Sequence, residues 1–343
     1  MTAAKKKISY LGLLKFIGVC AIMYYHTLPS EHSFSSLYLF VEFFFIITGY
    51  MTFKHFQSDG QALCGNGIEE KSQNAIRYTL KKFIGMIPYV VIALIMMYGL
   101  ELIKAIAAGG EAVADLLKSM PADILLLNSQ TGASEWPIWF LSAMIIAFPV
   151  FTLVCQIKHT KTLYIFAATF SVVYYFSFFN ADIFFWKAIL RAFAGMVLGI
   201  VCYGLAEKIG SLNVSKGGAV WLQILQTVVF LLAVFSMYPA RTSENAGFFM
   251  KETVLLFFIH LTLLLSGKTP THNISCRVFD FLEKISMILF LVHIPWMMIW
   301  NEFPIGISYY PKRALELLSC IAVSIILYLI VEKIRKNKIK KAK

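Results

Sequence analysis

The sequence has few charged residues and lacks any long hydrophilic stretch. Asp, Glu, Lys and Arg together make up 15% of its 343 residues, whereas 59% are hydrophobic and the mean hydropathy is +0.71. Charged residues make up about 25% of an ordinary soluble domain, so this composition excludes a mainly soluble chain. Apolar runs of about 20 residues, long enough to cross a hydrocarbon core about 30 Å thick as helices, recur from end to end. We therefore expect an all-α, polytopic membrane helix bundle in which residues 1–343 form one transmembrane domain.

The cysteines form no ligand or redox pattern. Six of them stand at positions 20, 64, 155, 202, 276 and 320, mostly inside apolar runs, and no CxxC or Cys/His spacing occurs. Thiols placed in this way are typical of structural residues, so the sequence predicts no metal site and no permanently bound cofactor. No internal repeat is visible either, so the inverted-repeat signature of many secondary transporters is missing.

The formal net charge of +12 is distributed as an orientation signal rather than as a nucleic-acid surface. Basic residues gather at the ends of apolar runs and in the C-terminal tail, residues 334–343, whereas acidic residues collect in the longest interruption, residues 104–136. Cytoplasmic segments of membrane proteins carry an excess of Lys and Arg. We therefore expect an even number of spans, both termini in the cytoplasm, a basic cytoplasmic tail and no nucleic-acid partner.

Apolar windows bounded by charges and turn residues predict about ten transmembrane helices. The interruption at 104–136 is too polar to span, and its middle part favours an amphipathic helix on the outer face. The predicted spans are 9–29, 36–55, 80–103, 137–156, 162–179, 184–206, 218–238, 249–266, 278–300 and 313–333.

Lys15 and His26 lie eleven residues apart in the first predicted span. Eleven residues make about three helical turns, so both side chains are expected on one face of the helix. Placing a Lys at mid-depth of a membrane costs about 2.5 kcal/mol or more, so two ionisable groups on one face require an explanation. Either Lys15 extends to the inner interface and His26 ends the helix at the outer one, or both residues serve a function.

Further short motifs follow in order along the chain. Each combines aromatic and small residues with one or two charged, imidazole or indole side chains, within or at the start of a predicted span. They are VEFFFIITGYM at 41–51, KKFIGMIPY at 81–89, WPIWFLS at 136–142, RAFAGMVLG at 191–199 and ISMILFLVHIP at 285–295.

Together with Lys15 and His26, these motifs resemble those of integral-membrane acyltransferase family three, the O-acetyltransferases that modify bacterial surface polysaccharides. The family's first helix carries Arg and, after ten further residues, His; Lys15 stands in place of that Arg. Lys81 and Lys82 likewise replace the usual Arg before Ile-Pro-Tyr, and Phe290 stands where Tyr is common. Lys keeps the positive charge but lacks the planar fork with which Arg contacts a phosphate. The ordered motifs cover nearly the whole chain, which implies a single transmembrane acyltransferase domain.

The resemblance implies transfer of an acyl group, usually acetyl from acetyl-CoA, to a hydroxyl of an extracytoplasmic glycan or lipid-linked sugar. A hydroxyl is a poor nucleophile at neutral pH, so a base must remove its proton, and His26 is suited to this role. Glu42 is expected to orient His26 or to stabilise its charged form; the alternative is a carboxylate exposed at the outer interface. Lys15, Lys81 and Lys82 are expected to contact the phosphates of the acyl-CoA donor.

Arg191, Trp139 and His293 match family motifs and are the candidates for binding the acceptor. Structural roles stay open for each, because Arg191 can pair with Glu42 while Trp139 and His293 can pack inside the bundle. We expect a multi-pass protein of the bacterial inner membrane whose partners are acyl-CoA, the sugar acceptor and the lipid bilayer.

Two other functions stay open from the sequence, a transporter of a glycan or acylated precursor and an inactive scaffold. The motifs also leave open the acceptor, an acetyl or succinyl donor, direct transfer or an acyl-His26 intermediate, and the oligomeric state.

Overall fold

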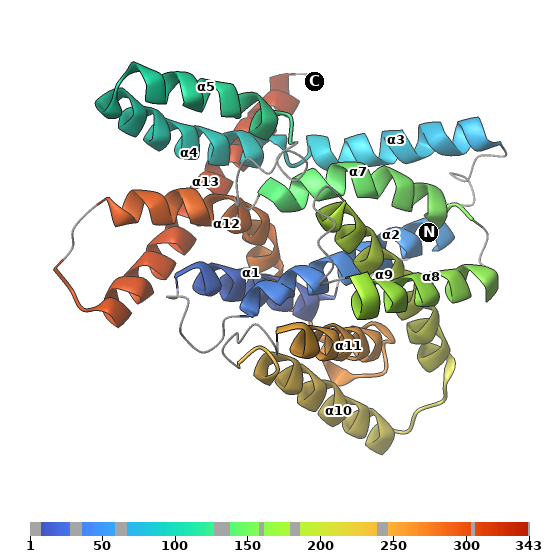
Figure 1. The fold of residues 1–343 in the computed structure, drawn as a ribbon. Coiled ribbons are helices and arrows are strands. Elements are labelled where there is room, and N and C mark those ends of the chain that lie inside the picture. Colours follow the sequence, from blue (N-terminus) through green and yellow to red (C-terminus); the bar gives the residue numbers. More distant parts are fainter. Residues whose placement is uncertain are drawn as a thin grey trace.

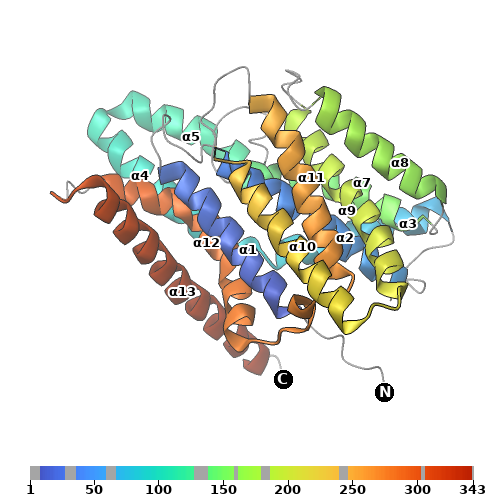
Figure 2. The ribbon, with the colours of Figure 1, turned by 90° about the horizontal axis from the view of Figure 1, so that it is seen from below.

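The computed structural model describes residues 8–27, 36–58, 67–126, 138–157, 161–178, 186–238, 246–302 and 306–341. Within these ranges the regular secondary structure is helical and contains no strand, so the all-α prediction is confirmed. The twelve α-helices of the described ranges form a bundle (Figures 1 and 2). They are α1 (Ser9–Thr27), α2 (Phe40–Ser58), α3 (Ile68–Ile84), α4 (Ile87–Ala108), α5 (Gly110–Ile124), α7 (Ile138–Cys155), α8 (Lys161–Val173), α9 (Lys187–Ser211), α10 (Lys216–Phe235), α11 (Ala246–Leu265), α12 (Arg277–Asn301) and α13 (Tyr309–Lys341).

Seven helices in the described ranges are long and apolar enough to cross a membrane, which indicates a multi-pass membrane protein. They are α2, α4, α7, α9, α10, α12 and α13, and each coincides with a predicted span. The other three predicted spans, 9–29, 162–179 and 249–266, coincide with the helices α1, α8 and α11. The number of ten spans stays a prediction.

The end of α1 lies beside the beginning of α13. The hydroxyl of Tyr309 donates a hydrogen bond to the carbonyl oxygen of Thr27, with the two oxygens 2.8 Å apart. The beginning of α1 and the end of α13 therefore lie together at the opposite end of the bundle (Figure 2). An even number of spans would produce this arrangement, and the assignment of that end to the cytoplasm stays a prediction.

The helix of the third predicted span begins at Ile87, not at residue 80. Pro88 has no N–H group and is tolerated in the first turn of a helix but not in its interior, so the chain ends α3 before Gly85 and starts α4 afresh. Lys81 and Lys82 consequently lie on the last turn of α3, an amphipathic helix that packs against α7. The helix that corresponds to the predicted span 80–103 therefore starts later than the predicted start, because Pro88 occupies its first turn.

The interruption at 104–136 contains the expected helix, α5. Gly109 separates it from α4 with a φ of 114°, a conformation that residues with a side chain rarely adopt. The chain reverses at this point, and α5 packs back against α4 (Figure 1). Its position on the outer face of the membrane stays a prediction.

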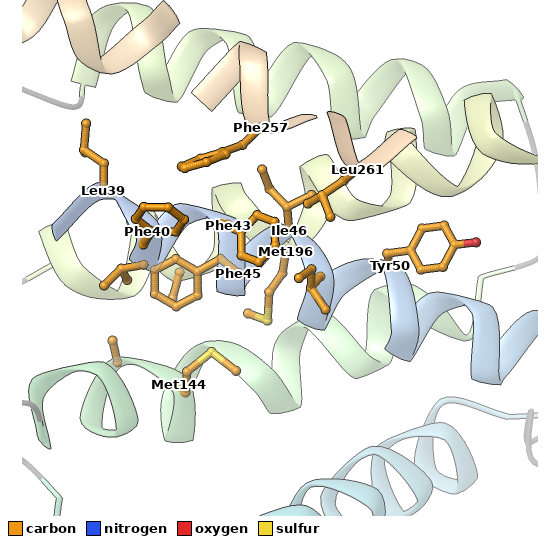
Figure 3. Close-up of a cluster of buried hydrophobic side chains, with 14 of the residues drawn as sticks. Leu39, Phe40, Phe43, Phe45, Ile46, Tyr50, Met144, Met196, Phe257 and Leu261 are labelled. Atoms are coloured by element: carbon orange, nitrogen blue, oxygen red, sulfur yellow. The ribbon is translucent and has the colours of Figure 1, made fainter. Parts of the chain in front are cut away.

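The centre of the bundle is the contact between α2 and α9, where the two backbones approach closely. A Cβ atom added to Gly49 would lie 2.0 Å from the Met196 carbonyl oxygen, and one added to Gly199 would lie 2.4 Å from the Tyr50 nitrogen. Small residues at helix contacts in membranes permit such an approach. Figure 3 shows apolar side chains of α2 packing against α7, α9 and α11 around this contact. The packing holds two charged residues, Glu42 on α2 and Arg191 on α9, in fixed relative positions.

A second close contact joins α1 and α12. A Cβ atom at Gly12 would lie 2.7 Å from the Phe279 carbonyl oxygen and 3.0 Å from the Cβ atom of Glu283. Contacts further along pair residue 15 with residue 283 and residue 26 with residue 293, so the two helices run in the same direction. This parallel pair carries the polar residues from which the candidate site is built.

Candidate active site

Two polar pairs lie along the contact between α1 and α12. At one end the Nζ atom of Lys15 donates a hydrogen bond to the Oε1 atom of Glu283 at 2.6 Å, and both side chains are about a quarter exposed (24% and 23%). At the other end the rings of His26 and His293 lie 5.3 Å apart between centroids. Eleven residues of helix separate Lys15 from His26, which is about 16 Å at 1.5 Å per residue. Glu283 was missed from the sequence, although it precedes His293 by nearly the spacing that separates Lys15 from His26.

His293 is fully buried, and its contacts indicate where its proton lies. Its Nδ1 atom is 2.6 Å from the carbonyl oxygen of Phe290. A carbonyl oxygen only accepts hydrogen bonds, so Nδ1 carries the hydrogen and Nε2 presents a lone pair. Nε2 has no hydrogen-bond partner among the described residues. His26 is the neighbouring polar ring and is itself exposed, so it is accessible to a second molecule.

A cavity of about 440 Å³ begins beside the Lys15–Glu283 pair. Lys15, Lys82 and Glu283 line it together with mainly apolar side chains from α1, α2, α3, α7 and α12. Phe140 and Phe290 line it as well, and their rings meet edge to face at 5.5 Å. The Phe290 ring lies 5.8 Å from the His293 ring, so Phe290 stands between the cavity and the histidine pair.

The two basic residues at the end of α3 point to different places. Lys82 lines the cavity, whereas Lys81 lines a separate surface depression with Gln73 and Arg77. Lys82 retains accessible surface, but apolar walls desolvate its ammonium group, and this desolvation, followed by the charges of Lys15 and Lys81, lowers its pKa. Like charges that repel at a cavity favour binding of an anion between them. The cavity can therefore receive a phosphate at its charged end and an apolar chain along its walls.

Glu42 is fully buried and belongs to a different contact from His26. Its carboxylate accepts hydrogen bonds from the Tyr175 hydroxyl and from the Arg191 Nε atom. The alternative of an exposed carboxylate is therefore wrong, and the pairing of Arg191 with Glu42 is present. Tyr175 was missed, because it lies in a one-turn π-helix, Tyr174–Phe178, outside every motif. A direct role of Glu42 toward His26 stays a prediction.

Aromatic rings connect the Glu42–Arg191 pair with His26. The guanidinium carbon of Arg191 lies 5.3 Å from the ring centre of Trp139 and 5.7 Å from that of Tyr38. Tyr25 contacts Tyr38 at 5.3 Å and its neighbour His26 at 4.9 Å between ring centroids. The structure thus brings Arg191, Trp139 and, through two tyrosines, His26 into one polar and aromatic region. Among the described residues no group of three His, Cys, Asp or Glu is placed to hold a metal ion.

Comparison with known proteins gives one match. A family model described as an acyltransferase domain matches residues 8–333, which include every site residue named above. No curated protein and no solved structure matches the chain.

Proposed function

The chain belongs to acyltransferase family three, whose model spans residues 8–333, and from this premise we propose that it is a membrane O-acyltransferase of the bacterial inner membrane. It moves an acetyl or similar short acyl group from cytoplasmic acyl-CoA to a hydroxyl of an extracytoplasmic glycan or lipid-linked sugar. The observation that carries this proposal is the arrangement along α1 and α12. Lys15, Lys82 and Phe290 line one cavity, and His293 and then His26 lie beyond Phe290.

The cavity suits the chemistry of the donor. CoA carries phosphates at one end, a long uncharged arm and the thioester at the other end. Lys15 and Lys82 act as point charges on the phosphates, the apolar walls enclose the arm, and the thioester reaches toward Phe290 and Phe140. The end of the bundle that carries Lys15, the beginning of α1 and the end of α13 then faces the cytoplasm.

The histidine pair suits removal of a proton from the acceptor. The Nε2 lone pair of His293 accepts the N–H of His26 when the two rings approach, which leaves the other nitrogen of His26 unprotonated and basic. His293 is then a positioning residue, because it selects the tautomer of His26. This role differs from the acceptor binding that we expected for His293 from the sequence.

The proposed reaction proceeds through His26 as a general base. The imidazole takes the proton of the acceptor hydroxyl, the hydroxyl oxygen bonds to the thioester carbonyl carbon, and the carbon–sulfur bond breaks. The departing CoA thiolate takes the proton from His26, so the histidine returns to its neutral form. The products are the acyl ester of the sugar and free CoA.

The first test compares ester content of surface glycans by mass spectrometry in cells that carry the wild type, His26→Ala or no copy. We expect acyl esters with the wild type and at least a 100-fold loss with His26→Ala, the scale typical of removing a general base. His272→Ala is the matched control, since His272 lies outside the site and binds the Leu264 carbonyl. Unchanged ester content with His26→Ala at equal protein level would contradict the catalytic role and favour a transporter.

A further inference from the structure

A second group of polar side chains, of which one is fully buried and two are half-buried, lies between α12 and α13. It consists of Trp300, Arg313 and Glu316, and we name it the α12–α13 polar cluster. Arg313 Nη1 donates a hydrogen bond to Glu316 Oε2 at 2.6 Å, and the Glu316 side chain has no exposed surface. These residues follow the last sequence motif, which ends at residue 295, so the resemblance gave them no role.

Three polar atoms of this cluster have no hydrogen-bond partner in the part of the chain that the structure describes. They are the Oε1 atom of Glu316, the Nε atom of Arg313 and the Nε1 atom of Trp300. Burying a polar atom without a partner is unfavourable, so most buried polar atoms in proteins are paired. Two donors and one acceptor together match a partner that both donates and accepts hydrogen bonds.

The packing of α12 against α13 brings these atoms to one level. The Nε1 atom of Trp296 donates a hydrogen bond to the Ser319 hydroxyl at 3.0 Å, which shows which residues of the two helices lie opposite each other. Trp300 lies about one turn beyond Trp296 on α12, and Glu316 lies about one turn before Ser319 on α13. Because the helices run in opposite directions, Trp300 and Glu316 face the same depth of the bundle.

The cluster adjoins the end of α1 that carries His26. The guanidinium group of Arg313 lies 5.2 Å from the ring centre of Tyr309. Tyr309 in turn binds the carbonyl of Thr27, the residue that follows His26. The cluster is therefore on the side of the bundle where the proposed base meets the acceptor, and opposite the end that carries Lys15.

We propose that the α12–α13 polar cluster binds hydroxyl groups of the sugar acceptor, an inference that rests on the proposed function. One hydroxyl donates to Glu316 Oε1 and accepts from Trp300 Nε1, and a neighbouring hydroxyl accepts from Arg313 Nε. A sugar carries such neighbouring hydroxyls, each with one donor and two acceptor lone pairs. The cluster makes and breaks no covalent bond; it holds the acceptor while His26 removes a proton from the reacting hydroxyl.

The test measures acyl transfer by the full chain, purified in detergent, from radiolabelled acetyl-CoA to deacylated surface glycan of cells that lack the gene. The glycan concentration and the acetyl-CoA concentration are varied separately. We expect Trp300→Phe to raise the KM for glycan at least fivefold and Glu316→Gln at least tenfold, with the KM for acetyl-CoA within twofold of wild type. A merely structural role would not raise one KM selectively.

Trp296→Phe is the matched control. Trp296 lies one turn before Trp300 on α12, and its indole N–H already has a partner, the Ser319 hydroxyl of α13. The substitution should leave both KM values within twofold. An unchanged KM for glycan in Trp300→Phe and Glu316→Gln, with an active wild type, would overturn the acceptor site and leave the proposed function intact. A parallel rise of both KM values would also overturn it. A wild type that transfers no label to glycan would overturn the proposed function itself.

Discussion

Two of the ion pairs that join helices far apart in the sequence differ in almost every physical respect. Glu42 and Arg191 join α2 and α9 in the centre of the bundle, with Glu42 fully buried and Arg191 13% exposed, and Tyr175 adds a further hydrogen bond. Lys15 and Glu283 join α1 and α12 and line a cavity, and each side chain is about a quarter exposed. Both pairs occur in helices of a membrane protein, yet only the second can exchange one of its partners for a charged ligand.

The difference shows that the contribution of an ion pair to a membrane bundle depends on how deeply the pair is buried. A buried pair with additional hydrogen bonds fixes the relative position of its helices, because removing one partner leaves an uncompensated charge. A partly exposed pair contributes little to stability, about 0–1 kcal/mol, so its counter-ion can change at small cost. We therefore propose that the Glu42–Arg191 pair positions the helices of the bundle and that Lys15, now paired with Glu283, contacts the donor.

The largest effect is expected at the buried pair. Glu42→Ala should lower the free energy of unfolding by about 3–5 kcal/mol, because the Arg191 charge stays buried without its partner. Tyr175→Phe removes a single hydrogen bond to a charged group and should cost about 2 kcal/mol. Denaturation in mixed detergent micelles measures both values. A Glu42→Ala protein as stable as the wild type would show that the pair does not hold α2 to α9.

A smaller effect is expected on donor binding, and it should differ between the two adjacent lysines of α3. Lys82→Ala should raise the KM for acetyl-CoA about tenfold, or about 1.4 kcal/mol, because it removes a charge from the cavity. Lys81→Ala is the matched control and should change this KM less than twofold, since Lys81 lines a different depression. Equal effects of the two substitutions in a steady-state transfer assay would contradict the placement of the donor phosphates.

The smallest effect should appear at Glu283, and its direction is informative. Glu283→Gln removes the negative charge that Lys15 now contacts, so the Lys15 ammonium becomes available to a phosphate. The KM for acetyl-CoA should fall about threefold, while the free energy of unfolding changes by less than about 1 kcal/mol. Lys15→Ala should raise the same KM. A rise of the KM in Glu283→Gln would indicate that Glu283 itself contacts the donor.

The first helix illustrates how much of the site was predictable. The eleven-residue spacing of Lys15 and His26 places both side chains on one face, because helical periodicity depends only on the local backbone. Their partners Glu283 and His293 follow them by more than 260 residues, and no local pattern relates the two segments. His293 was found through its motif, whereas Glu283 belongs to no motif and was missed.

Lys81 and Lys82 illustrate a part of the site that the sequence did not predict. Both were expected to contact the donor because they match the basic pair of one family motif, yet adjacent residues on a helix point about 100° apart. The packing of α3 against α7 decided that Lys82 faces the cavity and Lys81 does not. Pro88, which was present in the sequence, was the available signal that α3 is a separate helix.

The sequence by itself determined the helical membrane architecture, the family and the positions of His26, His293, Glu42 and Arg191. Composition and periodicity suffice for the architecture, because each helical segment buries its own apolar surface in lipid and closes its own backbone hydrogen bonds. The family and the four candidate positions followed from the resemblance of the ordered motifs. Only the tertiary structure decided which charges meet. It paired Glu42 with Arg191 and Lys15 with Glu283, and it placed the Arg313–Glu316 pair of α13 at the level of Trp300 on α12. Such contacts depend on how distant helices pack, and close packing of side chains is a property of the whole bundle.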